Sequence, residues 1–262
     1  MTAATDRDLA EFALRIGDDA LIAAQRLAEW SAMAPEMEED IALSNIALDQ
    51  LGVARAMLTY AAATLGGDED SLAFLREDRE FRNCLLVELP NAGPYAAHGA
   101  PGDFGVTMGK LLFLAAYQVL LYERLTASTD EQLAAIAAKA RKESAYHLDH
   151  ATLWTVRLGD GTEESHRRMQ TAVDELWPYT HELFVDDDLA ARVAQAGVAP
   201  VPSSLRAEWL DTVDNVLREA TLTRPEDGWR PIGGRSGRHT EHLSYLLAEM
   251  QVLHRAHPGA KW

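Results

Sequence analysis

The sequence predicts an all-α protein whose long helices pair as a four-helix bundle. Apolar residues recur every three or four positions over long stretches, which is the spacing of a helix with one buried face. No run shows sustained strand alternation, and clusters of Gly, Pro and Asp separate the periodic stretches. With 262 residues, 47% of them hydrophobic, the chain can bury a sizeable core, and we expect a single domain over 1–262.

The first two helices are expected to form an antiparallel hairpin. The first covers about 8–30, where apolar residues follow helical spacing. Pro35 opens the second, because a proline at the first helical position loses no hydrogen bond, and the pair Gly66-Gly67 ends it. The inner face of this second helix is predicted to comprise Ile41, Ala42, Asn45, Ile46, Asp49, Val53 and Ala56.

A second hairpin follows after a short charged helix over 68–82 and a loop over 89–102 that is rich in Gly and Pro. Its helices are expected over 103–126 and 130–158, with Asp130 as an N-cap and the glycines of 159–161 as a stop. Further helices are expected over 162–184, 203–223 and 240–254. Two long hairpins joined by a crossover, with helices added at the C-terminal end, form the layout of a ferritin-like four-helix bundle.

The net charge and the cysteine content limit the kinds of partner and the cellular compartment that we expect for this protein. Twenty-four basic residues against 41 acidic residues give a formal charge of −17, which repels phosphate backbones and anionic lipid. We therefore expect neither nucleic acid nor a membrane as a partner. The single cysteine, Cys84, excludes an internal disulfide, and the sequence shows no export signal, so a cytoplasmic location is expected. The longest apolar stretch, 111–122, is too short to span a bilayer.

The distribution of histidine argues against a complete metal centre. A di-iron bundle takes a Glu from each of two helices and a Glu-x-x-His pair from each of the other two. Residues 1–97 contain no histidine, so the first hairpin cannot supply its pair. We therefore expect an oxygenase-like scaffold that binds no metal or other cofactor, has no catalytic residue and serves to hold a partner.

Six residues mark the positions where such a scaffold would place metal ligands, and we interpret them as a vestigial site. Asn45 and Asp49 lie one turn apart on the second helix, with Gln118 on the third, where they can hydrogen-bond across the core. Asp18 and Asp19 could meet Asp49 across the first hairpin. The remaining three share one face of the fourth helix, as a polar cluster or as ligands of one metal: Glu143, His147 and His150.

Two further segments have alternative interpretations. Glu163-x-x-His166 is the only literal Glu-x-x-His in the sequence, but it falls in the first turn of a helix, so a solvated helix end is favoured. The segment 233–238, Gly-Gly-Arg-Ser-Gly-Arg, precedes a helix and could cradle a phosphate. No Walker pattern accompanies it, and a loop that docks on the body or on a partner is favoured.

Several segments together resemble one known family. They are LRIGDD at 14–19, QRLAEW at 25–30, NIALD at 45–49, LAF at 72–74, LVELPN at 86–91, AAKA at 137–140 with KE at 142–143 and YHL at 146–148, and HTEHL at 239–243 leading to LAEMQ at 247–251. The chain resembles, over essentially its whole length, the C subunits of the bacterial phenylacetyl-CoA ring 1,2-epoxidase, a multicomponent oxygenase of phenylacetate catabolism.

The resemblance implies a ferritin-like subunit that pairs with a homologous di-iron A subunit. In that family the A subunit binds the iron and the acyl-CoA, while the C subunit has lost the ligands and serves as a structural partner. A small B subunit and a reductase complete the complex, and no catalytic residue carries over to this chain. Two other hypotheses are an independent metalloenzyme using Glu143, His147 and His150, and a ferritin-like storage protein, which would need a carboxylate-rich centre that the sequence lacks.

Overall fold

A computed structural model describes residues 5–92 and 102–260 and shows an all-α, ferritin-like fold. Within these residues there are ten α-helices and no strand. Part of the predicted loop over 89–102 lies outside the described residues. The helices are α1 Asp6–Ala28, α2 Met37–Leu65, α3 Glu69–Phe74, α4 Leu85–Glu88, α5 Phe104–Leu125, α6 Glu131–Gly159, α7 Glu163–Thr180, α8 Asp188–Gln195, α9 Arg206–Glu219 and α10 Glu241–Ala256.

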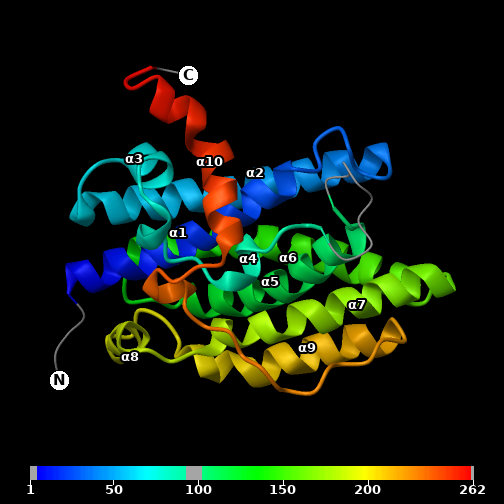
Figure 1. Ribbon diagram of the computed structural model, residues 1–262. Helices are drawn as coiled ribbons and strands as arrows, with labels where there is room; N and C mark the ends of the chain where they lie inside the picture. Colours follow the sequence, from blue (N-terminus) through cyan, green and yellow to red (C-terminus); the bar gives the residue numbers. More distant parts are fainter. Residues whose placement is uncertain (1–4, 93–101, 261–262) are drawn as a thin grey trace.

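Two antiparallel hairpins, α1 with α2 and α5 with α6, make up the four-helix bundle, as the sequence predicts. Figure 1 shows them as two layers, with α7 and α9 forming a further layer against α5 on the side away from α2. Helix α10 crosses the first hairpin beside α3 and projects beyond the body. The added helices therefore cover one side of the bundle and leave the outer side of α2 uncovered.

The ends of the long helices follow the local chemistry of the sequence. Thr5 and Asp8 form a reciprocal capping box at the start of α1. The predicted N-cap Asp130 is confirmed, since its Oδ1 accepts a hydrogen bond of 2.8 Å from the backbone N–H of Leu133. Gly66 ends α2 with a φ of 91°, a conformation that favours glycine. These signals position both hairpins from local sequence alone.

Helix α5 is the central element of the core. It is long and apolar enough to cross a membrane by length and composition, with a mean hydropathy of 1.6 over its most apolar window. However, 83% of that window is buried inside the fold, as expected for the core helix of a bundle. Trp209 of α9 and Trp177 of α7 pack against Phe113 of α5, which joins the added helices to the bundle core.

Two predicted elements have wrong boundaries, and one helix was not predicted. Helix α2 begins at Met37, because Glu36 is the extended N-cap residue and Pro35 precedes it. The segment 68–82 is not one helix: α3 ends at Phe74, and a 3₁₀ turn over Asp78–Glu80 follows. The chain folds back there around the buried Arg76, whose guanidinium contacts the carbonyl oxygens of Leu72 and Glu80. The short helix α8 was not predicted.

The predicted inner face of α2 is also wrong in part. Asn45 and Ile41 are exposed, the latter by 58%, whereas Gln50 is buried. The buried stripe is the set Leu43, Ile46, Ala47, Gln50, Val53, Ala54, Met57, Leu58, Ala61 and Ala62. Apolar residues lie on all sides of this helix, so their spacing alone could not determine which side faces the core.

Candidate functional site

The six predicted positions do not form one cluster, because the structure distributes them among separate contacts. Asn45 is exposed and lies outside the core. Gln118 of α5 is buried as predicted, and its partner is Gln50 of α2. The two side chains exchange amide hydrogen bonds of 2.8 and 3.1 Å. A neutral pair of amides that satisfy each other therefore lies between the two hairpins.

The amide pair allows a test by a double-mutant cycle. We expect Gln50→Leu or Gln118→Leu alone to lower the free energy of unfolding by about 1–3 kcal/mol, because the remaining amide is buried without a partner. The double substitution removes both polar groups and should recover most of that loss. Urea denaturation of the four proteins measures the cycle. Additive losses in the double variant would contradict a mutual pair.

The other candidates lie where α2 packs against α6, and we name this group of polar residues the α2/α6 seam. Its residues are Glu39, Asp49, Glu143, His147 and His150. Asp49 Oδ2 lies 3.1 Å from His147 Nε2, and Glu39 Oε2 lies 3.2 Å from His150 Nε2. Glu143 instead forms an ion pair of 2.9 Å with the exposed Lys139 on its own helix. Asp49 thus reaches across the bundle, as predicted, but to a histidine.

Burial favours the uncharged form of both seam histidines. It lowers the pKa of His147, against the opposing effect of Asp49, and it lowers the pKa of His150, against that of Glu39. In the described part of the chain no three His, Cys, Asp or Glu side chains are grouped so that they could hold a metal ion. Paired amides and separate His–carboxylate contacts do not fit the ligand set of a di-iron centre.

The predicted contact of Asp18 and Asp19 with Asp49 is wrong. Asp18 is fully buried and forms an ion pair with Arg76, with a 3.0 Å contact to its Nη1. Asp19 accepts hydrogen bonds of 2.6 and 3.0 Å from the guanidinium of Arg235. Neither carboxylate faces solvent or another acid, because an arginine from a distant segment neutralises each one.

The segment 233–238 docks on the body of this chain, as favoured from the sequence. Glu182 is buried and accepts a 2.7 Å hydrogen bond from the backbone N–H of Gly233. Gly234 packs directly against the backbone of Asn83, where a side chain would collide. Glu88, also buried, accepts a 2.6 Å hydrogen bond from the N–H of Thr240. Carboxylates occupy the place that a phosphate would need, so this segment is a structural strap.

His239 at the end of the strap should make stability depend on pH. Its Nδ1 lies 2.7 Å from Glu88 Oε2 and its Nε2 lies 3.1 Å from the carbonyl oxygen of Phe81. Burial opposes the charged ring, but Glu88, the Phe81 carbonyl and Glu182 together raise the pKa of His239. The native state therefore holds this proton more tightly than the unfolded state, and the stabilisation is present below the unfolded pKa of about 6.5.

The stabilisation by His239 should be lost as the pH rises through the raised pKa of the folded protein. We expect the stability gap between the wild type and His239→Gln to narrow between pH 5.5 and pH 9, as measured by urea midpoints. The control substitution is His166→Gln, because the ring of His166 lies beside the Gly159 carbonyl and the Thr221 hydroxyl and forms no ion pair with a carboxylate of the described residues. A gap that stays constant with pH would exclude the proposed protonation of His239.

A cavity of about 30 Å³ lies between the first hairpin and α5. Lys110 lines it and donates a 2.7 Å hydrogen bond to the carbonyl oxygen of Leu89. Burial, followed by the neighbouring Arg26, lowers the pKa of Lys110 to about 7. This volume holds a water molecule but not a small organic substrate, for which pockets of roughly 300–1,000 Å³ are usual.

Comparison with known proteins agrees with the family resemblance. The model of a family described as phenylacetic acid catabolic protein matches residues 1–262. The chain is 47% identical over 255 residues to the C subunit of the 1,2-phenylacetyl-CoA epoxidase of Escherichia coli (strain K12). The alignment covers 97% of this chain and 99% of that relative.

Proposed function

Since the chain belongs to the phenylacetic acid catabolic protein family, we propose that it is a non-catalytic structural subunit of a multicomponent di-iron oxygenase. That oxygenase would epoxidise the aromatic ring of phenylacetyl-CoA in phenylacetate catabolism. The similar protein from Escherichia coli is named as the C subunit of such an epoxidase, which implies other subunits. The role of this chain is to pair with the iron-bearing subunit and stabilise it.

The observation that carries the proposal is the Gln50–Gln118 pair at the centre of the bundle. Two neutral amides that satisfy each other offer neither the charge nor the free lone pairs that a pair of iron ions requires. The small volume of the cavity beside Lys110 supports the same assignment, because an acyl-CoA cannot enter it. Iron and substrate are therefore assigned to the partner.

The proposed partners are a homologous di-iron A subunit, which performs the oxygen insertion, and a small B subunit and a reductase in the wider complex. The proposed location is the cytoplasm. Nucleic acid and membranes are not proposed as partners, because a charge of −17 repels anionic surfaces. This chain itself is proposed to bind no cofactor.

The alternative is an independent metalloenzyme that uses Glu143, His147 and His150. Separate partners hold these side chains: Lys139 for Glu143, Asp49 for His147 and Glu39 for His150. Among the described residues these three side chains are not grouped so that they could hold one metal ion. The geometry therefore favours the structural subunit.

Purification of the chain alone, and then with the iron-bearing subunit, tests the proposal. After anaerobic reconstitution with ferrous iron, we expect far less than one iron per molecule of the isolated chain and stoichiometric iron in the co-purified pair. Metal analysis and native mass measurement provide both numbers. One or two irons per isolated chain would favour the metalloenzyme, and failure to form a complex would remove the structural role.

A further inference from the structure

The outer side of α2 carries large apolar side chains that no part of the chain within residues 5–92 and 102–260 covers. Met37, Ile41 and Leu48 are exposed by 77, 58 and 63% and lie on one stripe of the helix. Tyr146 and Leu153 of α6 are exposed by 53 and 56% and lie two turns apart on one stripe. Together with Leu51, exposed by 45%, these residues define what we name the α2/α6 face.

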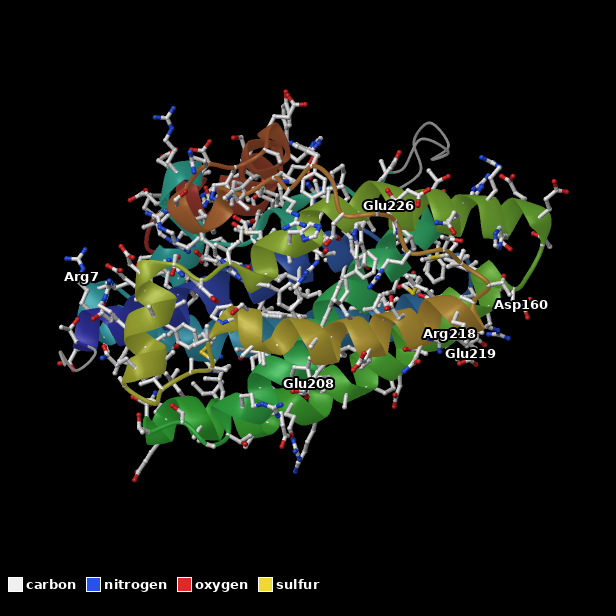
Figure 2. The ribbon with its side chains drawn as sticks, turned by 90° about the horizontal axis from the view of Figure 1, so that it is seen from below. Arg7, Asp160, Glu208, Arg218, Glu219 and Glu226 are labelled. Atoms are coloured by element: carbon white, nitrogen blue, oxygen red, sulfur yellow. The ribbon has the colours of Figure 1, made fainter. Side chains whose placement is uncertain are left out.

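The side of the molecule formed by α9 carries charged side chains instead of large apolar ones. Figure 2 labels Glu208, Arg218 and Glu219 on the outer surface of α9 and Glu226 on the segment that follows it. Four apolar residues of α9 are buried, namely Trp209, Val213, Val216 and Leu217. The outer side of α9 is therefore charged, whereas the α2/α6 face is apolar over two long helices; helix α10 also exposes apolar side chains, at Tyr245, Val252 and Leu253. An extended apolar face on two packed helices indicates an interaction site.

The polar groups beneath the face are incompletely satisfied. In the described part of the chain nine buried side-chain polar atoms have no hydrogen-bond partner, and two of those in the α2/α6 seam also take part in no ion pair. These two are Glu143 Oε2 and His147 Nδ1, whereas Glu39 Oε2 and His150 Nε2 lie 3.2 Å from each other. Native proteins leave few such atoms unpaired, so Glu143 Oε2 and His147 Nδ1 are available to bind water or another molecule.

The dimensions fit a stable interface. Helices α2 and α6 each have 29 residues, and a helix of that length spans about 43 Å. Two such helices side by side present a face of roughly 850 Å², close to what one partner contributes to a standard interface. An apolar groove of about 400 Å³ extends the face past Leu48 and Leu51 toward Phe74 and Met250.

The charges favour a basic partner over a second copy of this chain. Glu38, Glu39 and Asp40 occupy the first turn of α2, while its last turn has no basic residue. A second copy, laid antiparallel along α2, would bring the last turn of its own α2, which has no basic residue, against these acids. Two chains of charge −17 would also repel each other. A different subunit with an apolar helical face and basic residues near the start of α2 fits better.

We propose that the α2/α6 face is the surface on which this chain binds the iron-bearing subunit. The inference rests on the proposed function, since it takes that subunit as the occupant. It adds the location of the contact, which is the apolar surface along α2 and α6. It also adds the chemistry of the partner, which is a helix-lined face with basic residues opposite Glu38, Glu39 and Asp40.

A double substitution in the face, Ile41→Asp with Leu48→Asp, tests the proposal against a matched control. Ile232→Asp makes the same kind of substitution, with one added negative charge instead of two, at an isoleucine that is 54% exposed but lies outside the face. We expect the double variant to bind the iron-bearing subunit roughly 100-fold more weakly, as for loss of central interface residues, and the control to bind as the wild type does. All three isolated chains should have similar melting temperatures, because the altered positions are exposed.

The outcomes separate this inference from the proposed function. If the wild type binds the iron-bearing subunit and the double variant binds equally well, the α2/α6 face is not the contact, and the structural role stands. If the wild type itself does not bind, the proposed function fails. A wild-type chain that dimerises alone, and becomes monomeric on the double substitution, would identify a second copy as the occupant and overturn the assignment of the partner.

Discussion

Arg235→Ala should lower the free energy of unfolding by about 3–5 kcal/mol, the typical cost of removing one partner of a buried ion pair. The guanidinium holds both carboxylate oxygens of Asp19 and donates a 2.9 Å hydrogen bond to the carbonyl oxygen of Arg82. Its loss leaves a carboxylate that is only 7% exposed without its cation. The strap, and α10 behind it, should then detach from the bundle.

Denaturant unfolding of the purified chain measures the effect of Arg235→Ala. Arg238→Ala is the matched control, because that arginine lies in the same strap but is exposed and forms only a 3.4 Å side-chain hydrogen bond, to Ser236. The control should change stability by less than about 0.5 kcal/mol, as is usual for exposed positions. Equal effects of the two substitutions would show that the buried pair with Asp19 does not stabilise the fold.

Trp209→Ala should cost a similar amount, about 3–5 kcal/mol, because it removes a large buried aromatic side chain from the core. The ring is 1% exposed and contacts the rings of Phe113, Trp177 and Phe184 at centroid distances of 5.8, 5.6 and 5.2 Å. Its indole N–H also donates a 3.0 Å hydrogen bond to the carbonyl oxygen of Phe113.

Trp229→Ala provides the control for the tryptophan, since Trp229 is 68% exposed and contacts the ring of Tyr179 alone among aromatic side chains of the described residues. Thermal and urea unfolding of both variants measure the difference. A small effect of Trp209→Ala would mean that α9 is an appendage and not part of the core. We expect α9 and the four-helix bundle to unfold together.

The hairpins could be predicted because their signals are local. Asp130 caps α6 and Gly66 ends α2, and each acts through its own backbone or its nearest neighbours. The face of α2 could not be predicted, because Ile41 and Leu48 are as apolar as the buried Leu43 and Ile46. If the outer stripe of α2 binds another subunit, this helix must be apolar on two sides. The spacing of apolar residues in one sequence then cannot show which side faces the core and which faces the partner.

The polar contacts at the candidate site were predicted only in part. The pairing of Asp49 with a side chain across the core was predicted. Asp19, however, pairs with Arg235, which is 216 residues away, and no local sequence pattern predicts such a contact. Gln50 was missed, although a signal existed. It is the single polar residue in the stripe that Leu43, Ile46, Val53 and Met57 define at helical spacing, and such a residue in a core needs a polar partner.

The central claim is that this chain supplies structure and another subunit supplies chemistry. The most direct measurement is the turnover of phenylacetyl-CoA by the purified iron-bearing subunit and its reductase, with and without this chain. We expect little epoxidation by the iron-bearing subunit alone. Turnover should rise as this chain is added and should reach its maximum near one chain per iron-bearing subunit. Full turnover in its absence would contradict the account.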